Sequence, residues 1–220
     1  MAVESYVPED PFAEDDLPEI VFVGRSNVGK SSLIRALTRG AADARVGKRP
    51  GVTRRPVFHV LDDELVLVDL PGYGFMSGVP RRFQEKVRRD IVRYLETKET
   101  ILFAVHVVDA PFMPKILERC EKRGEVPFDM EMFQFLNELD LDPAVAANKI
   151  DKLKPIEFDE TMDAVVEALG MFPPWRQWLD TVYPVSARTG EGLVELMEGL
   201  QERLKRAGHP DLVRFFSVSR

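Results

Sequence analysis

The feature that most constrains this chain is the run Gly-Arg-Ser-Asn-Val-Gly-Lys-Ser at positions 24–31. An apolar stretch, residues 20–23, precedes it, and a helical pattern over residues 32–37 follows it. This order matches the phosphate-binding loop (P-loop) G-x-x-x-x-G-K-[ST], which joins a buried strand to the N-terminus of a helix. Its glycines permit backbone angles that a Cβ would block, so successive N–H groups can surround phosphate oxygens. We therefore predict a phosphate site made of Gly24, Arg25, Ser26, Asn27, Val28, Gly29, Lys30 and Ser31.

Two side chains of this loop have a predicted chemical role. Lys30 supplies a mobile positive charge for the β- and γ-phosphates, beside the positive end of the following helix. Ser31 can offer its hydroxyl to Mg²⁺. The competing interpretation is a chance glycine-rich turn, which the complete octet in a strand-to-helix setting disfavours. The loop alone does not separate kinases, ATPases and GTPases, so the rest of the chain must decide.

A second motif, D-x-x-G, follows the apolar run at residues 65–68. Its first residue, Asp69, is expected at the tip of a strand, where it would sit behind Mg²⁺ as an outer-shell anchor. The N–H of Gly72 could approach a γ-phosphate because no side chain intervenes. An ordinary acidic turn is the alternative. The residues of this motif are Asp69, Leu70, Pro71 and Gly72.

A third motif, N-K-x-D, indicates which base is bound. A carboxylate at Asp151 can accept hydrogen bonds from N1–H and the 2-amino group of guanine, and adenine offers neither. Lys149 would cover the ring and contact the P-loop, and Asn148 would tie the two loops together. The alternative is an ordinary helix N-cap. The motif consists of Asn148, Lys149, Ile150 and Asp151, and the supporting run, in which an Ala N–H would reach guanine O6, consists of Val185, Ser186 and Ala187.

The segment between the first two motifs is the place for a switch loop. Thr53 is the candidate to give its hydroxyl to Mg²⁺ when γ-phosphate is present and to release it after hydrolysis. The dipeptide Pro50-Gly51 would form the turn that leads into it. A basic loop with an idle threonine is the alternative.

Short β-rich runs alternate with helical periodicity from residue 19 onward, which predicts an α/β fold with a mostly parallel sheet between two helical layers. We expect a P-loop NTPase domain of the Ras-like kind, with six strands and one antiparallel edge strand. The edge strand comes from a hairpin closed by Asp62-Asp63. The expected strands are residues 19–24, 56–61, 64–69, 101–108, 143–148 and 181–185. The expected helices are residues 30–38, 81–96, 129–139, 157–169 and 191–206.

Three parts are expected along the chain. Residues 1–18 are acidic and proline-containing, which indicates a loosely held arm, residues 19–207 form the domain, and residues 208–220 form a tail. Residues 110–127 are interpreted as an inserted surface segment, and a solvated excursion and a partner-binding role both remain open. The apolar tail either packs on the domain or binds a partner.

Composition excludes several classes of protein. The net charge of −7 argues against general polyanion binding. A single cysteine, Cys120, fits a reducing cytoplasm. The longest apolar run, residues 101–108, is far shorter than the roughly 20 residues needed to cross a bilayer. We expect a cytoplasmic monomer that does not associate with membranes.

Taken together, these motifs closely resemble the EngB family (YihA/YsxC-like) of GTPases, in the TRAFAC class. The specific strings are G-R-S-N-V-G-K-S-S at residues 24–32 and D-L-P-G-Y-G at residues 69–74. Three features resemble the archaeal branch of the family: the run Gly51-Val52-Thr53-Arg54, Asn148, and the extra segment after residue 110. The resemblance covers roughly residues 19–206.

This resemblance implies a Mg²⁺-dependent protein that binds GTP and GDP, associated with assembly of the large ribosomal subunit and with cell division and septation. It implies that Ser31 and Thr53 take Mg²⁺, and that Lys30, Thr53 and Gly72 act in hydrolysis. It also implies nucleotide contacts from the switch segment, namely Gly51, Val52, Thr53, Arg54 and Arg55.

Several mechanistic expectations follow. Tyr73 stands where Ras-like enzymes hold a water-orienting glutamine, so slow intrinsic hydrolysis is expected, and Asn27 suggests K⁺ beside the phosphates. Basic residues of the switch segment and of the helix at residues 81–96 suggest docking to ribosomal RNA, with a solvated helix face as the alternative. The three histidines lack ligand spacing, which favours packing or exposure over zinc binding or base catalysis. A nearly inactive GTP-dependent module that recruits a protein partner is the alternative function.

Overall fold

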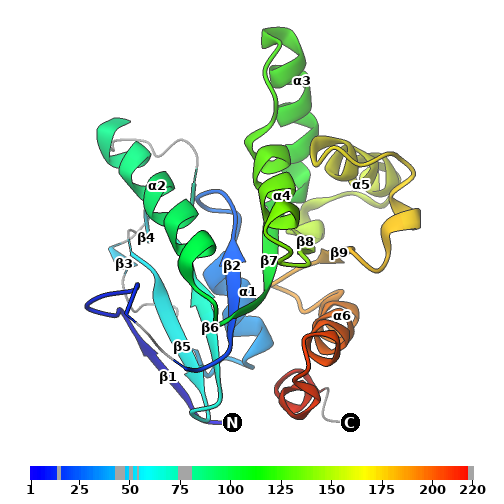
Figure 1. The fold of residues 1–220 in the computed structure, drawn as a ribbon. Coiled ribbons are helices and arrows are strands. Elements are labelled where there is room, and N and C mark those ends of the chain that lie inside the picture. The colour runs from blue at the N-terminus through cyan, green and yellow to red at the C-terminus, as the bar shows by residue number, and fades with distance from the viewer. Residues whose placement is uncertain (14–15, 43–47, 50–51, 54, 74–80, 218–220) are drawn as a thin grey trace.

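The computed structural model describes residues 1–220 except 14–15, 43–47, 50–51, 54, 74–80 and 218–220, and for residues 48, 49, 52, 53, 81 and 83 it describes the backbone alone. Within this part of the chain, a mixed β-sheet lies between two helical layers (Figure 1). The predicted fold class is confirmed, and the residues below show how the fold builds one end of the sheet into a site.

The main sheet has seven strands in the order β1-β5-β6-β2-β7-β8-β9. Only β5 runs against its neighbours, since it pairs antiparallel with both β1 and β6, whereas β2, β6, β7, β8 and β9 are parallel. The strands are β1 (Val3–Tyr6), β2 (Glu19–Val23), β5 (Val57–Leu61), β6 (Leu65–Asp69), β7 (Ile101–Asp109), β8 (Ala144–Asn148) and β9 (Val182–Val185), and a separate short pair is β3 (Lys48–Arg49) with β4 (Val52–Thr53).

The α-helices are α1 (Lys30–Leu37), α2 (Arg81–Thr97), α3 (Met113–Arg123), α4 (Phe128–Glu138), α5 (Phe158–Ala168) and α6 (Leu193–Arg206). Short 3₁₀ segments are η1 (Ala110–Phe112), η2 (Ile150–Lys152), η3 (Pro155–Glu157), η4 (Trp175–Trp178) and η5 (Pro210–Phe216). No helix in these ranges is long and apolar enough to span a membrane.

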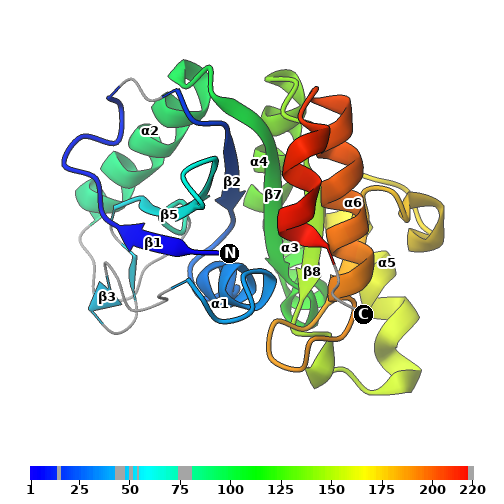
Figure 2. The ribbon, with the colours of Figure 1, turned by 90° about the horizontal axis from the view of Figure 1, so that it is seen from below.

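Strand β2 shows how the two layers are held. All five of its residues are buried, and successive side chains point to opposite faces. Ile20 and Phe22 pack with α1, α6 and η5, whereas Val21 and Val23 pack with α2 and α4. A strand that is apolar on both faces is typical of a parallel sheet covered on both sides. Figure 2, which views the sheet from its lower end, shows α2 and α6 on opposite sides of it.

The edge of the sheet differs from the prediction in strand number. Residues 3–6, expected within a loosely held arm, form β1 and pair with β5 from Val3 opposite Leu61 to Tyr6 opposite Phe58. The predicted hairpin of β5 and β6 is present, but β5 is the second strand and not the edge. Four residues that alternate between half-buried and exposed give too weak a pattern to separate a strand from a polar arm.

The described residues of the expected insertion and of the expected tail pack against the rest of the chain. The segment after β7 continues into α3, whose Met113 and Ile116 pack in a cluster with α5 and η4. In the tail, Leu212, Phe215 and Phe216 are buried against α1 and α6. Of the two possibilities for the tail, packing on the domain is therefore the one observed.

Candidate nucleotide-binding site

The P-loop lies at the C-terminal end of β2, with α1 directly after it. Gly24 has φ of +150° and Gly29 of +104°, conformations that L side chains rarely adopt. A Cβ at Gly24 would lie 2.2 Å from the carbonyl oxygen of Val107, and one at Gly29 would lie 2.4 Å from Nδ2 of Asn148. Both glycines are therefore required by the backbone and by close neighbours.

Lys30 is buried and its ammonium group turns back over the loop. Its Nζ donates to the carbonyl oxygens of Gly24 at 3.0 Å and Arg25 at 3.3 Å. These carbonyls hold the ammonium group over the loop. A bound phosphate would gain a preformed positive charge at the start of α1.

The hydroxyl of Ser31 and the carboxylate of Asp69 meet across the site, because β6 lies beside β2 in the sheet. Ser31 Oγ donates to Oδ2 of Asp69, and Asp69 Oδ1 is buried with no hydrogen-bond partner among the described residues. A hydroxyl beside a buried carboxylate with a spare oxygen is a set of hard oxygen donors, which Mg²⁺ prefers. These residues fit a Mg²⁺ site.

The D-x-x-G turn packs directly on the P-loop. A Cβ at Gly72 would lie 2.6 Å from both N and Cα of Ser26, so only glycine allows this approach. Ser26 Oγ donates to the carbonyl of Gly72 at 3.4 Å, and Arg25 forms a parallel β-bridge with Tyr73. The backbone of the second motif is therefore held against the first.

Asn148 joins three segments of the site. Its Nδ2 donates to the carbonyl of Val28 at 2.9 Å, and its Oδ1 accepts from the backbone N–H groups of Lys149 at 2.8 Å and Ala187 at 3.0 Å. The side chain is 2% exposed, so all of these polar groups are satisfied inside the protein. The expected link between the base loop and the P-loop is observed.

Lys149 extends this link along the surface. Its backbone is in the left-handed conformation, with φ of 72°. Its Nζ donates to the carbonyl of Asn27 at 2.6 Å and to Oδ2 of Asp109 at 2.5 Å. The predicted contact with the P-loop is thus present. Asp109, at the end of β7, was not predicted, because nothing in its local sequence marks it.

Asp151 carries the carboxylate expected to choose the base. Its Oδ1 accepts from Ser186 Oγ at 2.7 Å and its Oδ2 from Nε of Arg188 at 2.8 Å. The hydrogen bond from Ser186, followed by the charge and hydrogen bond of Arg188, holds the pKa of Asp151 below its ordinary value despite the opposing effect of desolvation. The carboxylate is therefore ionised and acts as an acceptor at neutral pH.

A cavity of about 590 Å³ adjoins this carboxylate. A purine base is flat, with apolar faces and polar edges, and a cavity with a few convergent polar groups is the usual form of a site for such a ligand. Its walls come from the P-loop, α1 and both base-recognition motifs, and include Gly29, Ser32, Asn148, Lys149, Asp151 and Ala187.

Of the remaining expected contacts, Gly51, Val52, Thr53, Arg54 and Arg55, only Arg55 has a described side chain. Gly51 and Arg54 lie outside the described residues, as does the side chain of Thr53, whose backbone forms β4 with Val52. Arg55 is exposed, and its guanidinium donates to the carbonyls of Pro8 at 2.6 Å and Glu9 at 2.7 Å. Among the described contacts, Arg55 thus binds the N-terminal segment.

Sequence reasoning also missed a buried group of polar side chains behind the D-x-x-G turn. The hydroxyl of Tyr73 lies 2.6 Å from Nε2 of His106 and donates to Oδ1 of Asp129 at 3.0 Å. These three residues come from distant parts of the sequence, so no spacing signal could have found them. Arg188 was missed as well, although its place directly after the Val185–Ala187 run was a usable signal.

Fold and site together define the class of this protein as a P-loop GTP-binding domain of the Ras-like kind. The family model described as 50S ribosome-binding GTPase matches residues 19–149. The probable GTP-binding protein EngB of Methanopyrus kandleri is 75% identical over 200 residues, covering 91% of this chain and 98% of that protein. That of Methanosarcina barkeri is 44% identical over 199 residues, covering 90% and 93%. The chain belongs to the EngB family of GTP-binding proteins.

The structural comparison agrees with this assignment. A crystal structure of a probable GTP-binding protein EngB aligns with a TM-score of 0.72 at 36% identity, covering 86% of this chain and 99% of that one. The two sequence relatives are archaeal, as the resemblance to the archaeal branch predicted. A structure of Era shares the fold at 19% identity, with a TM-score of 0.54.

Proposed function

We propose that this chain is a Mg²⁺-dependent GTPase that acts as a cytoplasmic switch in assembly of the large ribosomal subunit. The observation that carries the GTP-binding part is the connection made by Asn148, which joins the P-loop to the cavity beside Asp151. A single ligand that reaches both ends needs a polyphosphate at one end and, at the other, a base with two adjacent donors. Guanine nucleotides meet both requirements.

In this proposal each residue has a distinct task. Backbone N–H groups of the P-loop and the ammonium of Lys30 bind the β- and γ-phosphates, and the carboxylate of Asp151 accepts two hydrogen bonds from guanine. Ser31 and Thr53 would hold Mg²⁺, and Asp69, which accepts a hydrogen bond from Ser31, would support the site. The ion, when bound, neutralises charge on the β- and γ-phosphates. Gly72 donates its N–H to the γ-phosphate.

The proposed rate of hydrolysis is low without stimulation. The hydroxyl of Tyr73 is bonded to His106 and Asp129, so it does not orient an attacking water, and a rate on the order of 10⁻⁴ to 10⁻³ s⁻¹ is expected. Asn27 is exposed in the P-loop with φ of 68°, where its side chain could help hold K⁺. Hydrolysis should be faster in KCl than in NaCl, and equal rates in the two salts would remove the K⁺ part of the proposal.

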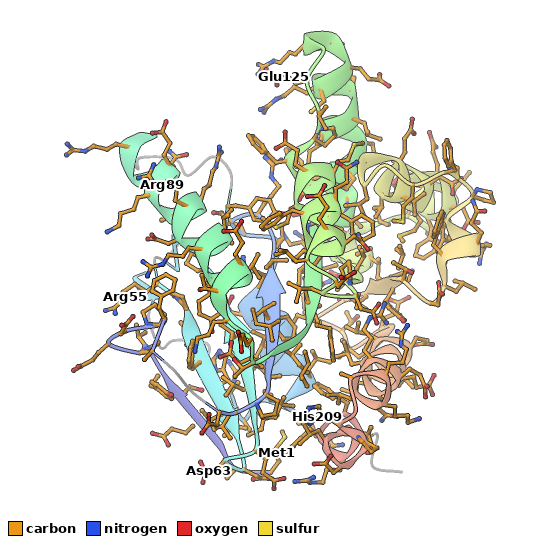
Figure 3. The ribbon with its side chains drawn as sticks, in the orientation of Figure 1. Met1, Arg55, Asp63, Arg89, Glu125 and His209 are labelled. Atoms are coloured by element: carbon orange, nitrogen blue, oxygen red, sulfur yellow. The ribbon has the colours of Figure 1, made fainter. Side chains whose placement is uncertain are left out.

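The ribosomal part rests on the family description and on the charge of α2. Arg82, Lys86 and Arg89 are exposed along this helix, and Figure 3 labels Arg89 at the upper left of the view. Arg88 differs from them, because its guanidinium packs 4.4 Å from the ring centre of Phe128. The first three form the surface proposed to contact ribosomal RNA. The role in cell division and septation implied by the family resemblance stays a prediction.

The test is sedimentation with ribosomal particles in the presence of GTP, GDP or a non-hydrolysable GTP analogue. Co-migration with the large subunit in the analogue alone, lost in R82E/R89E, supports the proposal. The matched control is K205E/R206E, which makes the same change of net charge on α6 at exposed residues. Binding that is unchanged in R82E/R89E would exclude α2 as the docking surface. Tight GTP binding without turnover, even with K⁺ and subunits present, would instead favour a recruiting module.

A further inference from the structure

Tyr73 follows directly after the D-x-x-G motif and its side chain is almost wholly buried. The residue is 4% exposed, and its hydroxyl lies within hydrogen-bond distance of both Nε2 of His106, on β7, and Oδ1 of Asp129, on α4. The last two residues are themselves fully buried. One phenol thus joins the end of the second motif to a strand and to a helix.

Asp129 carries the connection back to the P-loop. Its Oδ2 lies 3.5 Å from NH1 of Arg25. The backbone of Arg25 in turn forms a β-bridge with Tyr73. Burial opposes the charge on Asp129, but the neighbouring His106, Arg25 and Tyr73 hold its pKa below the ordinary value. Burial and the nearby carboxylate raise the pKa of Tyr73 well above its ordinary value, so the phenol keeps its proton and can donate.

The arrangement costs stability that a packing role alone does not require. Asp129 Oδ2 and His106 Nδ1 are buried and make no hydrogen bond within the described residues. Incompletely satisfied buried polar groups destabilise a fold, and an apolar cluster at this place would avoid that cost. Such groups are found where a defined geometry is needed.

The cluster of Tyr73, His106 and Asp129 restrains the backbone conformation of Gly72. This residue is held on one side by the close approach to Ser26 and on the other by the anchored Tyr73. Because the backbone has only two soft dihedral angles per residue, the contact of Gly72 with Ser26 and the anchoring of Tyr73 together limit the direction of the Gly72 N–H. A donor aimed in advance at a ligand binds it at lower entropic cost.

We propose that Tyr73, held by Asp129 and His106, is a positioning residue that aims the N–H of Gly72 at the terminal phosphate. Preference for a triphosphate over a diphosphate then depends on a buried cluster that touches neither nucleotide. This inference rests on the proposed function, since it needs a chain that binds GTP. It predicts that damage to the cluster changes discrimination between nucleotides more than it changes nucleotide binding in general.

The test compares dissociation constants for GDP and for a non-hydrolysable GTP analogue, both with Mg²⁺, by calorimetry. In Y73F the analogue should bind about tenfold more weakly, the effect of losing one hydrogen bond to a charged partner, while GDP binding stays within about twofold. D129N keeps an acceptor for the phenol but loses the charge that faces Arg25. It should show a smaller shift in the same direction.

The matched control is Y94F. Tyr94 is also buried and donates to a buried carboxylate, Glu19 Oε2, at 2.5 Å, but at the opposite end of β2. Its loss should lower the melting temperature and leave the ratio of the two dissociation constants unchanged. This control separates a general loss of stability from a loss of positioning.

The outcomes can be told apart. Equal weakening of GDP and analogue in Y73F, or no change in their ratio, would overturn the positioning role. If Y73F does not fold, the same criterion applies to D129N. A wild-type protein that binds neither nucleotide would instead refute the proposed function, and a wild-type protein that binds both equally would overturn this inference alone.

Discussion

The two ends of strand β2 each hold a buried tyrosine beside a buried carboxylate, and the two pairs differ in how fully they are bonded. At the far end, both oxygens of Glu19 accept hydrogen bonds, from Tyr94 at 2.5 Å and Thr100 at 3.1 Å, and Lys98 lies 3.5 Å away. At the P-loop end, Asp129 accepts from Tyr73 but leaves Oδ2 without a hydrogen bond.

The unbonded groups are not spread evenly over the described residues. The buried side-chain atoms without a hydrogen-bond partner belong to Asp69, Arg88, His106 and Asp129, all in or next to the P-loop end. Figure 3 places the labelled Met1, Asp63 and His209 at the other end. A buried polar atom without a hydrogen bond lowers stability even where it keeps another contact, as Asp129 does with Arg25, so among the described residues this cost falls on the P-loop end.

The largest expected effect is on GTP affinity, and it should distinguish two lysines, one at each end of β2. Lys30 serves the P-loop end, whereas Lys98 serves the far end, where it donates to the carbonyl of Ala13 at 2.6 Å. K30A should weaken GTP binding by about 100-fold or more, because it removes a charge-assisted contact to two phosphates. K98A should lower the melting temperature and leave GTP affinity within about twofold. Calorimetry with both variants measures the contrast, and equal loss of affinity would refute it.

A second change sharpens the comparison by testing the choice of base. D151N replaces an acceptor pair with one acceptor and one donor, which suits the N1–H and 2-carbonyl of xanthine better than guanine. We expect GTP affinity to fall by about 100-fold and XTP to bind more tightly than GTP. Competition between the two nucleotides gives the ratio directly. A variant that still prefers GTP would show that Asp151 does not read the base.

The far end gives an effect on stability alone. E19Q removes the charge that Lys98 faces and alters the hydrogen bonds from Tyr94 and Thr100. The free energy of unfolding should fall by about 1–3 kcal/mol. Urea denaturation measures this loss, and nucleotide titration of the same sample should show unchanged affinities. If affinity fell together with stability, the two ends would not be independent.

The smallest effect concerns pH. Because the pKa of Asp151 is lower in the folded protein than in the unfolded chain, its carboxylate stabilises the fold above the ordinary pKa of about 3.9 and loses this effect as pH falls through the lowered value. The stability difference between wild type and D151N, below about 1 kcal/mol since Arg188 is largely exposed, should be constant from pH 7 to 5. It should vanish only below about pH 4, and loss already at pH 5 would contradict the assignment.

Much of the fold could be predicted because its signals are local. The six predicted strands begin and end within about a residue of those observed, since apolar runs end at the motifs. Helix α3 was not among the expected helices, although Pro114 and Gly124 lie at its two ends. They in fact mark the helix: the proline lies in its first turn, and Gly124 ends it with φ of 61°.

The residues of the site likewise divide into those that a local sequence pattern could predict and those that it could not. Residues within one motif, such as Asn148 and Asp151, were predictable because their chemistry follows from position in a short string. The cluster of Tyr73, His106 and Asp129 was not, because tertiary packing alone brings these three residues together.

Strand β1 has a practical consequence for how this protein is handled. It covers the outer edge of β5 with a full register of four residue pairs, and the backbone of Ala2 accepts a hydrogen bond from the N–H of Asp62 at 3.1 Å. Deletion of the first six residues would expose the edge of β5, whose backbone amide and carbonyl groups would then lack partners. Such an edge is a template on which strands of further copies could pair. Purification tags should therefore not replace the first six residues.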